Sequence, residues 1–237
     1  MCGRFSLTPG AIPLLDATFE LEGAEAALVG RWNIAPTQAV AIVRAVDGRR
    51  RLELARWGLL PAWLRDAARA PLLINARADT VAEKPAFRDA LRHRRCLVPA
   101  DGFFEWAPPP AGAPKAAPKQ PHWFRLAAGG PFALAGLWEC WTPPEGPPVL
   151  SVTLITTEAN ACVASVHDRM PVILPPEAHA TWLDPACEAP EAVLPMLRPY
   201  PAERMTRTPV STRLNSARED DPSLVEQASP VVQPRLF

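Results

Sequence analysis

The first five residues, MCGRF, place a cysteine where removal of Met1 would make it the N-terminus. A terminal Cys2 carries a thiol and a free α-amine on neighbouring carbons, with pKa values of about 8.5 and about 7.7–8.0 in unperturbed peptides. Such a 1,2-aminothiol can act as a thiolate nucleophile or as an amine, and it can close on an aldehyde as a thiazolidine. The alternative interpretation is a start-site accident in a frayed terminus, so the rest of the chain must decide.

Four short segments carry polar residues where their neighbours are apolar. They are RWNIAPTQ (31–38), PLLINARADT (71–80), VPADGFFEWAP (98–108) and SVHDRMPVIL (165–174). Glu105 lies inside an aromatic cluster, which would desolvate its carboxyl group and raise its pKa towards neutrality. Together with Asn75 and His167, such a glutamate is what acid–base chemistry around an amine or thiol nucleophile requires.

Each of these residues also has a purely structural interpretation. Asn33 comes shortly before a proline and can be a turn residue that makes local hydrogen bonds. Glu105 alternates with aromatic residues and can occupy the solvent side of a half-buried strand. A His–Asp contact at a helix end would account for His167, and Arg77 can be a surface charge. The residue chemistry alone leaves both interpretations open.

Composition and charge exclude several classes of protein. The chain has 48% hydrophobic and 21% charged residues, which is an ordinary globular composition. Five scattered cysteines without a CxxC pair argue against structural zinc and against a disulfide framework. We therefore expect no metal and no organic cofactor. With 25 basic and 25 acidic residues, bulk electrostatics do not favour nucleic acid, although a local basic groove can still attract phosphate.

No segment of the sequence predicts a membrane protein. No run approaches the roughly 20 apolar residues that a membrane span needs, and the N-terminus lacks the pattern of a secretory signal. We therefore expect a cytoplasmic protein, associated with the nucleoid in a bacterium or located in the nucleus in a eukaryote.

Strand-like segments outnumber helical ones. β-Branched and aromatic content predicts strands over 38–46, 50–57, 95–106, 122–126, 132–141 and 149–157, and helices are expected over 86–94, 158–166, 176–183 and 190–198. The dipeptide DG at 47–48 indicates a hairpin. Because strands and helices do not alternate regularly, we expect an α+β fold, with surrounding helices on a mostly antiparallel, barrel-like sheet.

The chain is expected to form a single domain over residues 1–220, followed by a tail over 221–237. Its 30 prolines cluster in two places. APPPAGAPKAAPKQP (107–121) is a low-complexity segment, and TPPEGPP (142–148) is a shorter turn. Strand-like sequence resumes on both sides of each, so both are interpreted as surface loops within the domain.

Seven short motifs together resemble the SRAP family, the SOS-response-associated peptidases whose members shield abasic sites in single-stranded DNA. In chain order they are MCGRF, WNIAPTQ, RWGLLPAW, LINARADT, ADGFFEW, VHDRMPVIL and LNSARED. They cover roughly residues 1–220, and their co-occurrence is specific although each motif alone is weak. The resemblance implies the SRAP fold and an abasic-site sensor of the DNA damage response that acts as a monomer.

The resemblance also implies a mechanism. Loss of Met1, assisted by the site itself, would expose Cys2, whose amine and thiol would close a thiazolidine on the aldehyde of an abasic deoxyribose. Glu105 matches the family's catalytic glutamate and would move protons to and from the amine and imine. His167 matches the histidine that assists sugar ring opening and crosslink reversal, and Asn75 matches the asparagine that positions the cysteine and the sugar.

Contacts with single-stranded DNA are expected beside these motifs. Guanidinium groups would bind the phosphates that flank the lesion, and a tryptophan would stack on a base. The expected DNA-binding residues are Arg4, Asn33, Trp63, Arg77 and Arg169. The family has a second tryptophan after the position of Trp63, where this sequence has Leu64.

Two other classes of function compete with this prediction. An N-terminal-nucleophile hydrolase, such as a glutamine amidotransferase, also uses a mature terminal cysteine, but no segment resembles the glutamine-binding motifs. A non-covalent single-strand-binding module would explain the arginines and tryptophans and leave Cys2 and Glu105 without a role. An AP-lyase activity is compatible with the main prediction, since a Schiff base at C1′ permits β-elimination.

Overall fold

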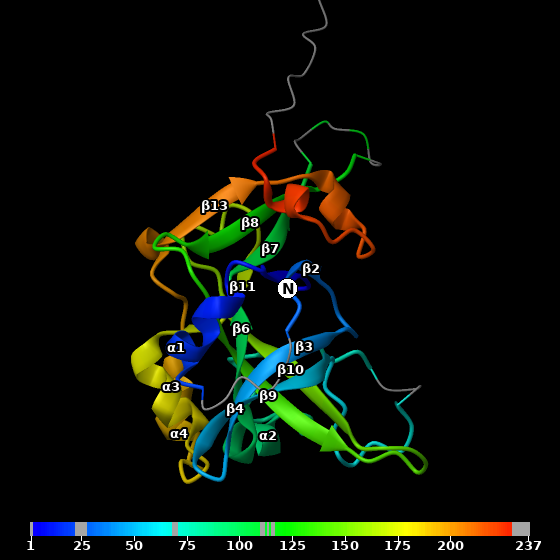
Figure 1. The fold of residues 1–237 in the computed structure, drawn as a ribbon, viewed down its shortest axis with the longest axis vertical. Helices are drawn as coiled ribbons and strands as arrows, with labels where there is room; N and C mark the ends of the chain where they lie inside the picture. Colours follow the sequence, from blue (N-terminus) through cyan, green and yellow to red (C-terminus); the bar gives the residue numbers. More distant parts are fainter. Residues whose placement is uncertain are drawn as a thin grey trace, which may run out of the picture.

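The computed structural model describes residues 2–21, 28–67, 71–109, 112, 114 and 117–228. Two antiparallel-rich β-sheets dominate this part of the chain, with short helices along one side (Figure 1). The five-stranded sheet has the order β13-β8-β7-β1-β2, with β1 Phe5–Leu7, β2 Arg31–Ile34, β7 Gly102–Ala107, β8 Gln120–Leu126 and β13 Met205–Pro209. The eight-stranded sheet contains β3 Ala39–Val46, β4 Arg49–Trp57, β5 Asn75–Arg77, β6 Arg95–Ala100, β9 Phe132–Trp141, β10 Val149–Glu158, β11 Arg169–Pro171 and β12 Ile173–Leu174.

The helices are short. The α-helices of the described residues are α1 Leu15–Phe19, α2 Arg88–His93, α3 Pro176–Leu183 and α4 Pro190–Val193. Single 3-10 turns occupy Ile12–Leu14, Leu194–Met196, Ala202–Arg204, Thr212–Asn215 and Pro222–Val225. None of these helices combines the length and the apolar character that crossing a membrane requires.

The eight-stranded sheet closes on itself. The path β10–β4–β3–β6–β9 returns to β10, because β9 and β10 also pair. Most pairs are antiparallel, and β10 runs parallel to β4 and β5. The prediction of an α+β fold is confirmed. The barrel-like sheet is a ring of strands and not a barrel. Between β3 and β6 the only registered pair is Val43–Leu97, so this ladder is too short to continue a barrel wall.

A two-residue turn sets the register of the first long hairpin. Asp47 and Gly48 both have positive φ, 52° and 76°, and Val46 pairs with Arg49 across the turn. A type I′ turn needs positive φ at both central positions, which Asp and Gly tolerate best. The hairpin predicted from DG is therefore present between β3 and β4.

The predicted strand 95–106 divides into β6 and β7, which belong to different sheets. Asp101 lies at the crossing, where its backbone N–H donates to the Ser6 carbonyl oxygen at 2.9 Å. Its carboxylate accepts from Ser6 Oγ at 2.7 Å and from the Thr8 backbone N–H at 3.1 Å. These bonds fix the point at which the chain leaves one sheet for the other, a point that β-propensity alone does not mark.

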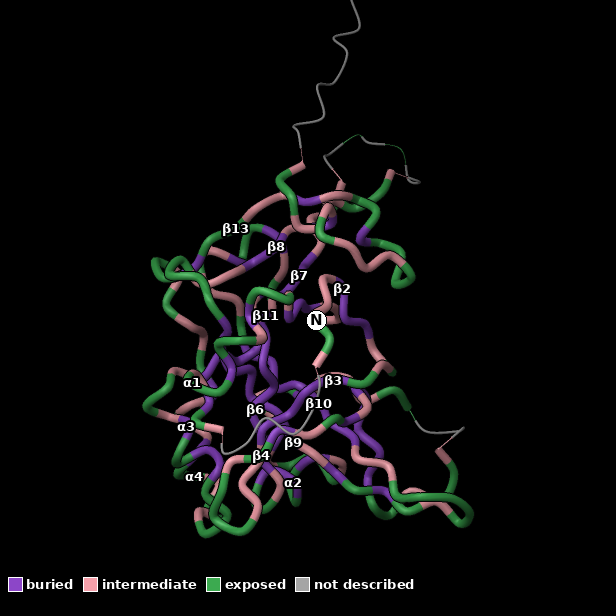
Figure 2. Tube along the Cα trace, viewed as in Figure 1, coloured by how far each residue is buried: buried purple, intermediate pink, exposed green. Residues whose placement is uncertain are grey.

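The two sheets share one hydrophobic core. Phe5 of β1 and Trp57 of β4 pack edge to face with ring centroids 5.1 Å apart, which joins the sheets at their centre. Figure 2 shows the buried chain running through both layers. A smaller cluster covers the outer face of the five-stranded sheet, and its buried members are Phe104, Trp123, Val210, Leu214 and Leu224.

The helix predictions are confirmed in part. The helix predicted over 176–183 is α3, that over 86–94 shortens to α2, and that over 190–198 becomes α4 followed by a 3-10 turn. The helix predicted over 158–166 is wrong, because hydrogen-bonded turns replace it. Asn160 explains the difference: its Oδ1 accepts from the Val163 N–H at 3.1 Å and its Nδ2 donates to the Tyr200 carbonyl oxygen at 2.6 Å.

Packing continues beyond residue 220. Leu224 is fully buried, Val210 and Gln227 form a β-bridge, and the Ala228 N–H donates to the Pro209 carbonyl oxygen at 2.9 Å. The segment 221–228 of the predicted tail is thus part of the domain, and 229–237 lies outside the described residues. The Pro-rich segment 107–121 joins β7 to β8, although residues 110, 111, 113, 115 and 116 also lie outside the described residues.

Replacement of Gly102 by alanine tests the crossing between the sheets. A Cβ at Gly102 would lie 1.9 Å from Trp123 Nε1, which donates to Ser6 Oγ at 3.0 Å. We expect Gly102→Ala to lower the free energy of unfolding in urea by about 1–3 kcal/mol through overpacking. Gly10→Ala is the matched control, since a methyl group there would meet no atom within 4 Å beyond its chain neighbours; equal stability of the two variants would contradict the prediction.

Candidate active site

Cys2 is held between the two sheets. It is completely buried and comes shortly before β1 in the five-stranded sheet. Its carbonyl oxygen accepts from Nδ2 of Asn75 at 2.8 Å, and Asn75 belongs to β5, which pairs with β10 in the eight-stranded sheet. Asn75 Oδ1 is buried and has no hydrogen-bond partner among the described residues, so it can accept from a bound molecule beside the cysteine.

Glu105 lies on β7 and faces the same side of the sheet as Phe103, towards the main core, while Phe104 and Trp106 face the smaller cluster. Only 3% of Glu105 is exposed. Burial raises the pKa of Glu105 to about 7, and the Asp168 carboxylate adds to this increase. A carboxyl group with this pKa can both accept and donate a proton at neutral pH.

The same buried environment changes the pKa of the Cys2 thiol. Burial raises its pKa, and the Glu105 carboxylate raises it further. Sγ lies 3.6 Å from the Arg4 carbonyl oxygen, to which it can donate. The resting thiol is therefore protonated at neutral pH, and it needs a neighbouring base to become a nucleophile.

His167 follows the turns that replace the predicted helix. Its Nδ1 lies 3.0 Å from the Arg169 backbone nitrogen, whose N–H it accepts when the ring nitrogen carries no proton. Burial lowers the pKa of His167, against the opposing effect of Asp168, whose Oδ1 lies 2.9 Å from Nδ1. Since Asp168 also raises the pKa of Glu105, one carboxylate acts on both His167 and Glu105.

Arg4 points into the protein, where it joins distant parts of the chain. Its guanidinium donates to Asn33 Oδ1 at 2.8 Å and to the Leu214 carbonyl oxygen at 2.9 Å. Asn33 is fully buried, and its Nδ2 donates to the carbonyl oxygens of Ser216 and Glu219 at 3.0 and 2.8 Å. Both side chains were predicted to contact DNA, and in this arrangement they hold the strand that follows Cys2.

Residues 214–220, which we name the clasp, complete this support. Asp220 accepts from the Trp32 and Asn33 backbone N–H groups at 2.7 and 3.0 Å and from Arg31 Nε at 2.7 Å. Asn215 Oδ1 accepts from Nε1 of Trp106, next to Glu105, at 2.6 Å. Sequence reasoning gave Asn215 and Asp220 no role. The run of polar residues in LNSARED was the sequence feature that could have identified them as contact residues.

The remaining predicted DNA-binding residues differ in accessibility. Arg77 is exposed and donates to both carboxylate oxygens of Asp79, at 3.1 and 2.6 Å. Arg169 is mostly buried and donates to the Thr156 carbonyl oxygen at 2.7 Å. Both flank the site, because Asn75 and Arg77 share β5 and Arg169 follows Asp168.

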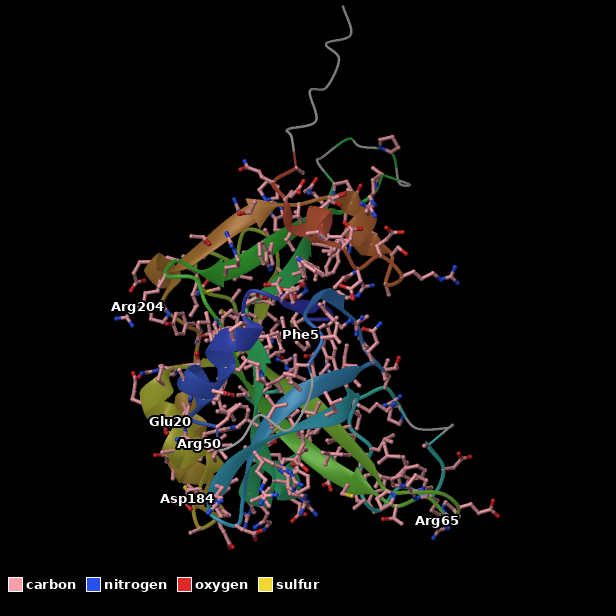
Figure 3. All side chains as sticks on the ribbon, in the orientation of Figure 1. Phe5, Glu20, Arg50, Arg65, Asp184 and Arg204 are labelled. Carbon is pink, nitrogen blue, oxygen red and sulfur yellow. The ribbon has the colours of Figure 1, made fainter. Side chains whose placement is uncertain are left out.

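Trp63 is not gathered into this cluster. It is 67% exposed, and its segment is anchored by Trp141 Nε1, which donates to the Leu64 carbonyl oxygen at 2.7 Å. In Figure 3 Arg65 of the same segment lies at the lower right margin, whereas Phe5 lies between the sheets.

Fold and site together define an α+β protein with a buried N-terminal cysteine beside a glutamate that titrates near neutrality. Residues 1–217 match the family described as SOS response associated peptidase (SRAP), and the chain belongs to this family.

Named relatives align with most of the chain. Abasic site processing protein YoqW of Bacillus subtilis (strain 168) is 38% identical over 228 residues, which is 95% of this chain and 99% of that protein. Abasic site processing protein HMCES of Gallus gallus is 33% identical over 191 residues, which is 70% of this chain and 54% of that protein. A crystal structure of a Bacteroides thetaiotaomicron protein superposes with a TM-score of 0.84 at 26% identity, covering 96% of this chain and all of the other.

Replacement of Glu105 by glutamine tests its pKa through stability. The folded state binds the proton of Glu105 more tightly than the unfolded state, so the wild-type protein loses stability as the pH rises from 4.5 through about 7. Glutamine carries no charge. We expect the Glu105→Gln variant to gain about 3 kcal/mol of unfolding free energy relative to wild type between pH 4.5 and pH 8 in urea denaturation. The exposed-site variant Glu145→Gln should show no such gain, and a pH-independent difference for Glu105→Gln would refute the assignment.

Replacement of Asp220 by alanine tests the clasp. Three donors would lose their acceptor, two of them backbone N–H groups of β2. We expect the free energy of unfolding to fall by about 2–3 kcal/mol, measured by urea denaturation at neutral pH. The control is Glu226→Ala, a change at an exposed position close by in the sequence; a loss no larger than the control's would contradict this role.

Proposed function

We propose that this protein processes abasic sites in DNA by forming a covalent bond between Cys2 and the aldehyde of the open-chain sugar. The observation that carries the proposal is the placement of a completely buried Cys2, anchored by Asn75, beside Glu105 with its pKa of about 7. Family membership and the names of the relatives, abasic site processing proteins, support it.

The first step is hydrolysis of the bond between Met1 and Cys2. It consumes one water and releases methionine, and it leaves Cys2 with a free α-amine. The hydrogen bond from Asn75 to the Cys2 carbonyl oxygen keeps the residue in place while the preceding bond is cut. Glu105 is the base that takes the proton of the attacking water and the acid that gives it to the departing amine. This step is the peptidase activity of the protein.

The second step captures the sugar. The Cys2 amine adds to C1′ of the ring-opened deoxyribose and the carbinolamine loses water, for which Glu105 supplies the proton. The Schiff base then accepts the thiol: sulfur bonds to C1′ and the thiol proton moves to nitrogen. The product is a thiazolidine, so the protein and the DNA are joined without an outside oxidant or reductant.

His167 acts on the sugar. Burial lowers the pKa of His167, so its ring can exchange a proton with the sugar ring oxygen and hydroxyl as the deoxyribose opens. The same exchange run backwards assists reversal of the crosslink. Where the ring fails to close, the Schiff base permits β-elimination, which gives the protein a secondary AP-lyase activity.

The partner is single-stranded DNA, bound without sequence preference by a monomer. Phosphate contacts carry no base code, and Arg77 is exposed beside the site to make them. A strand without a complement can also present a sugar to a nucleophile buried between two sheets more readily than a duplex can.

Cys2→Ala tests the proposal directly. We expect purified wild-type protein to form a heat-stable adduct with a single-stranded oligonucleotide carrying one abasic site, and to lack the mass of Met1. Denaturing gels and intact mass spectrometry measure both. Cys2→Ala should form no thiazolidine adduct, and Cys140→Ala, a change at an exposed cysteine, should react as wild type.

Protein that begins at Cys2 and still forms no adduct would overturn the proposal. Glutaminase activity in that protein would indicate an N-terminal-nucleophile hydrolase. Equal, reversible binding of damaged DNA by wild type and Cys2→Ala would indicate a non-covalent binding module.

A further inference from the structure

Strand pairing extends the face that bears Glu105 across the five-stranded sheet. Glu105 pairs with His122 of β8, and Phe124 of β8 pairs with Arg207 of β13. Directly paired residues point to the same face, and so do residues two apart on one strand. Arg207 therefore lies diagonally beside His122, on the face that carries the candidate acid–base group.

Arg207 reaches from this sheet to the segment that carries His167. Its guanidinium donates to Oγ of Ser165, two residues before His167. Arg207 is exposed and forms no ion pair with a carboxylate in the described part of the chain. Burial lowers the pKa of the His122 ring. The positive charge of Arg207 lowers this pKa further, because it opposes protonation of the ring.

Lys119 lies at the end of the same sheet where β8 begins. It directly precedes β8, whose first residue Gln120 pairs with Ala107, two residues beyond Glu105 on β7. Lys119 is exposed and has no ion pair with a described carboxylate. The positive charge of Lys119 favours lower pKa values for both Glu105 and His167, and this effect is smaller than that of burial.

These two cations differ from the arginines on the other side of the site. Arg77 donates two hydrogen bonds to Asp79, and Arg169 is mostly buried, with Asp79 Oδ2 4.0 Å from its guanidinium. Lys119 and Arg207 thus leave positive charge uncompensated along one edge of the site. Exposed cations without carboxylate partners are suited to a polyanion that arrives from solvent.

We propose that Lys119 and Arg207 form a phosphate-binding edge, which holds the DNA backbone on the β8–β13 side of the lesion. The inference rests on the proposed function, because it takes the DNA strand to be the polyanion. It gives the Pro-rich segment 107–121 a role: its last residues present Lys119 to the strand. It also places the phosphate contacts on both sheets, with Arg77 on one and Arg207 on the other.

The salt dependence of binding tests this edge. We would measure anisotropy of a fluorescein-labelled, undamaged oligothymidine with wild type, Lys119→Gln, Arg207→Gln and the double variant at a series of KCl concentrations. Each lost phosphate contact should reduce the slope of log K against log [KCl] by about 0.7, and the double variant should lose about 1.4. Arg198→Gln is the control, an exposed arginine that lines a separate cavity with Glu177 and Arg204.

Crosslinking separates this inference from the proposed function. At saturating abasic-site DNA, the double variant should still form the thiazolidine adduct, because neither side chain is assigned a chemical step. An unchanged salt slope in the double variant, with normal crosslinking, would overturn the phosphate-binding edge alone. A reduced slope in the double variant, with no adduct formed by the wild-type protein, would support the edge and overturn the proposed function. The midpoint of thermal unfolding is measured for each variant, and a midpoint equal to that of wild type shows that the substitution changes binding without changing the fold.

Discussion

The guanidinium of Arg4 is the contact on which the site depends most. It binds the side chain of Asn33 and the backbone of the clasp, so it joins the first strand, the second strand and a segment two hundred residues away. Asn33 in turn binds the clasp, and Asp220 closes the set on β2. Because Arg4 is two residues from Cys2, this network decides where the cysteine lies.

Burial explains why such support is needed. Burial raises the pKa values of both the Cys2 thiol and the Glu105 carboxyl group, and the Glu105 carboxylate raises that of the thiol further. At neutral pH the thiol therefore keeps its proton and Glu105 is only partly ionised, which limits the buried negative charge. A chain end with so few local contacts would leave that environment if Asn75 and the clasp did not hold it.

Local patterns in the sequence predicted most strands and failed where distant contacts decide. The long strands β3, β4, β9 and β10 follow from alternation and the DG turn. Residues 158–166 have helix-forming side chains but form turns, because Asn160 binds the backbone of Tyr200. The motifs named the site residues, and the structure gathers Cys2, Asn75, Glu105 and His167. No local pattern could show that Arg4 and Asn33 bind residues 214–219 rather than solvent.

The clasp determines when the site can form during synthesis of the chain. Cys2 and Arg4 leave the ribosome well before the partners of Arg4 and Asn33 at 214–220 do. The nucleophile therefore exists long before its pocket can close. A nascent chain carries Cys2 through synthesis without the surroundings that would let Glu105 act on it, so the completed fold, and not the cysteine, sets the moment at which the protein becomes reactive.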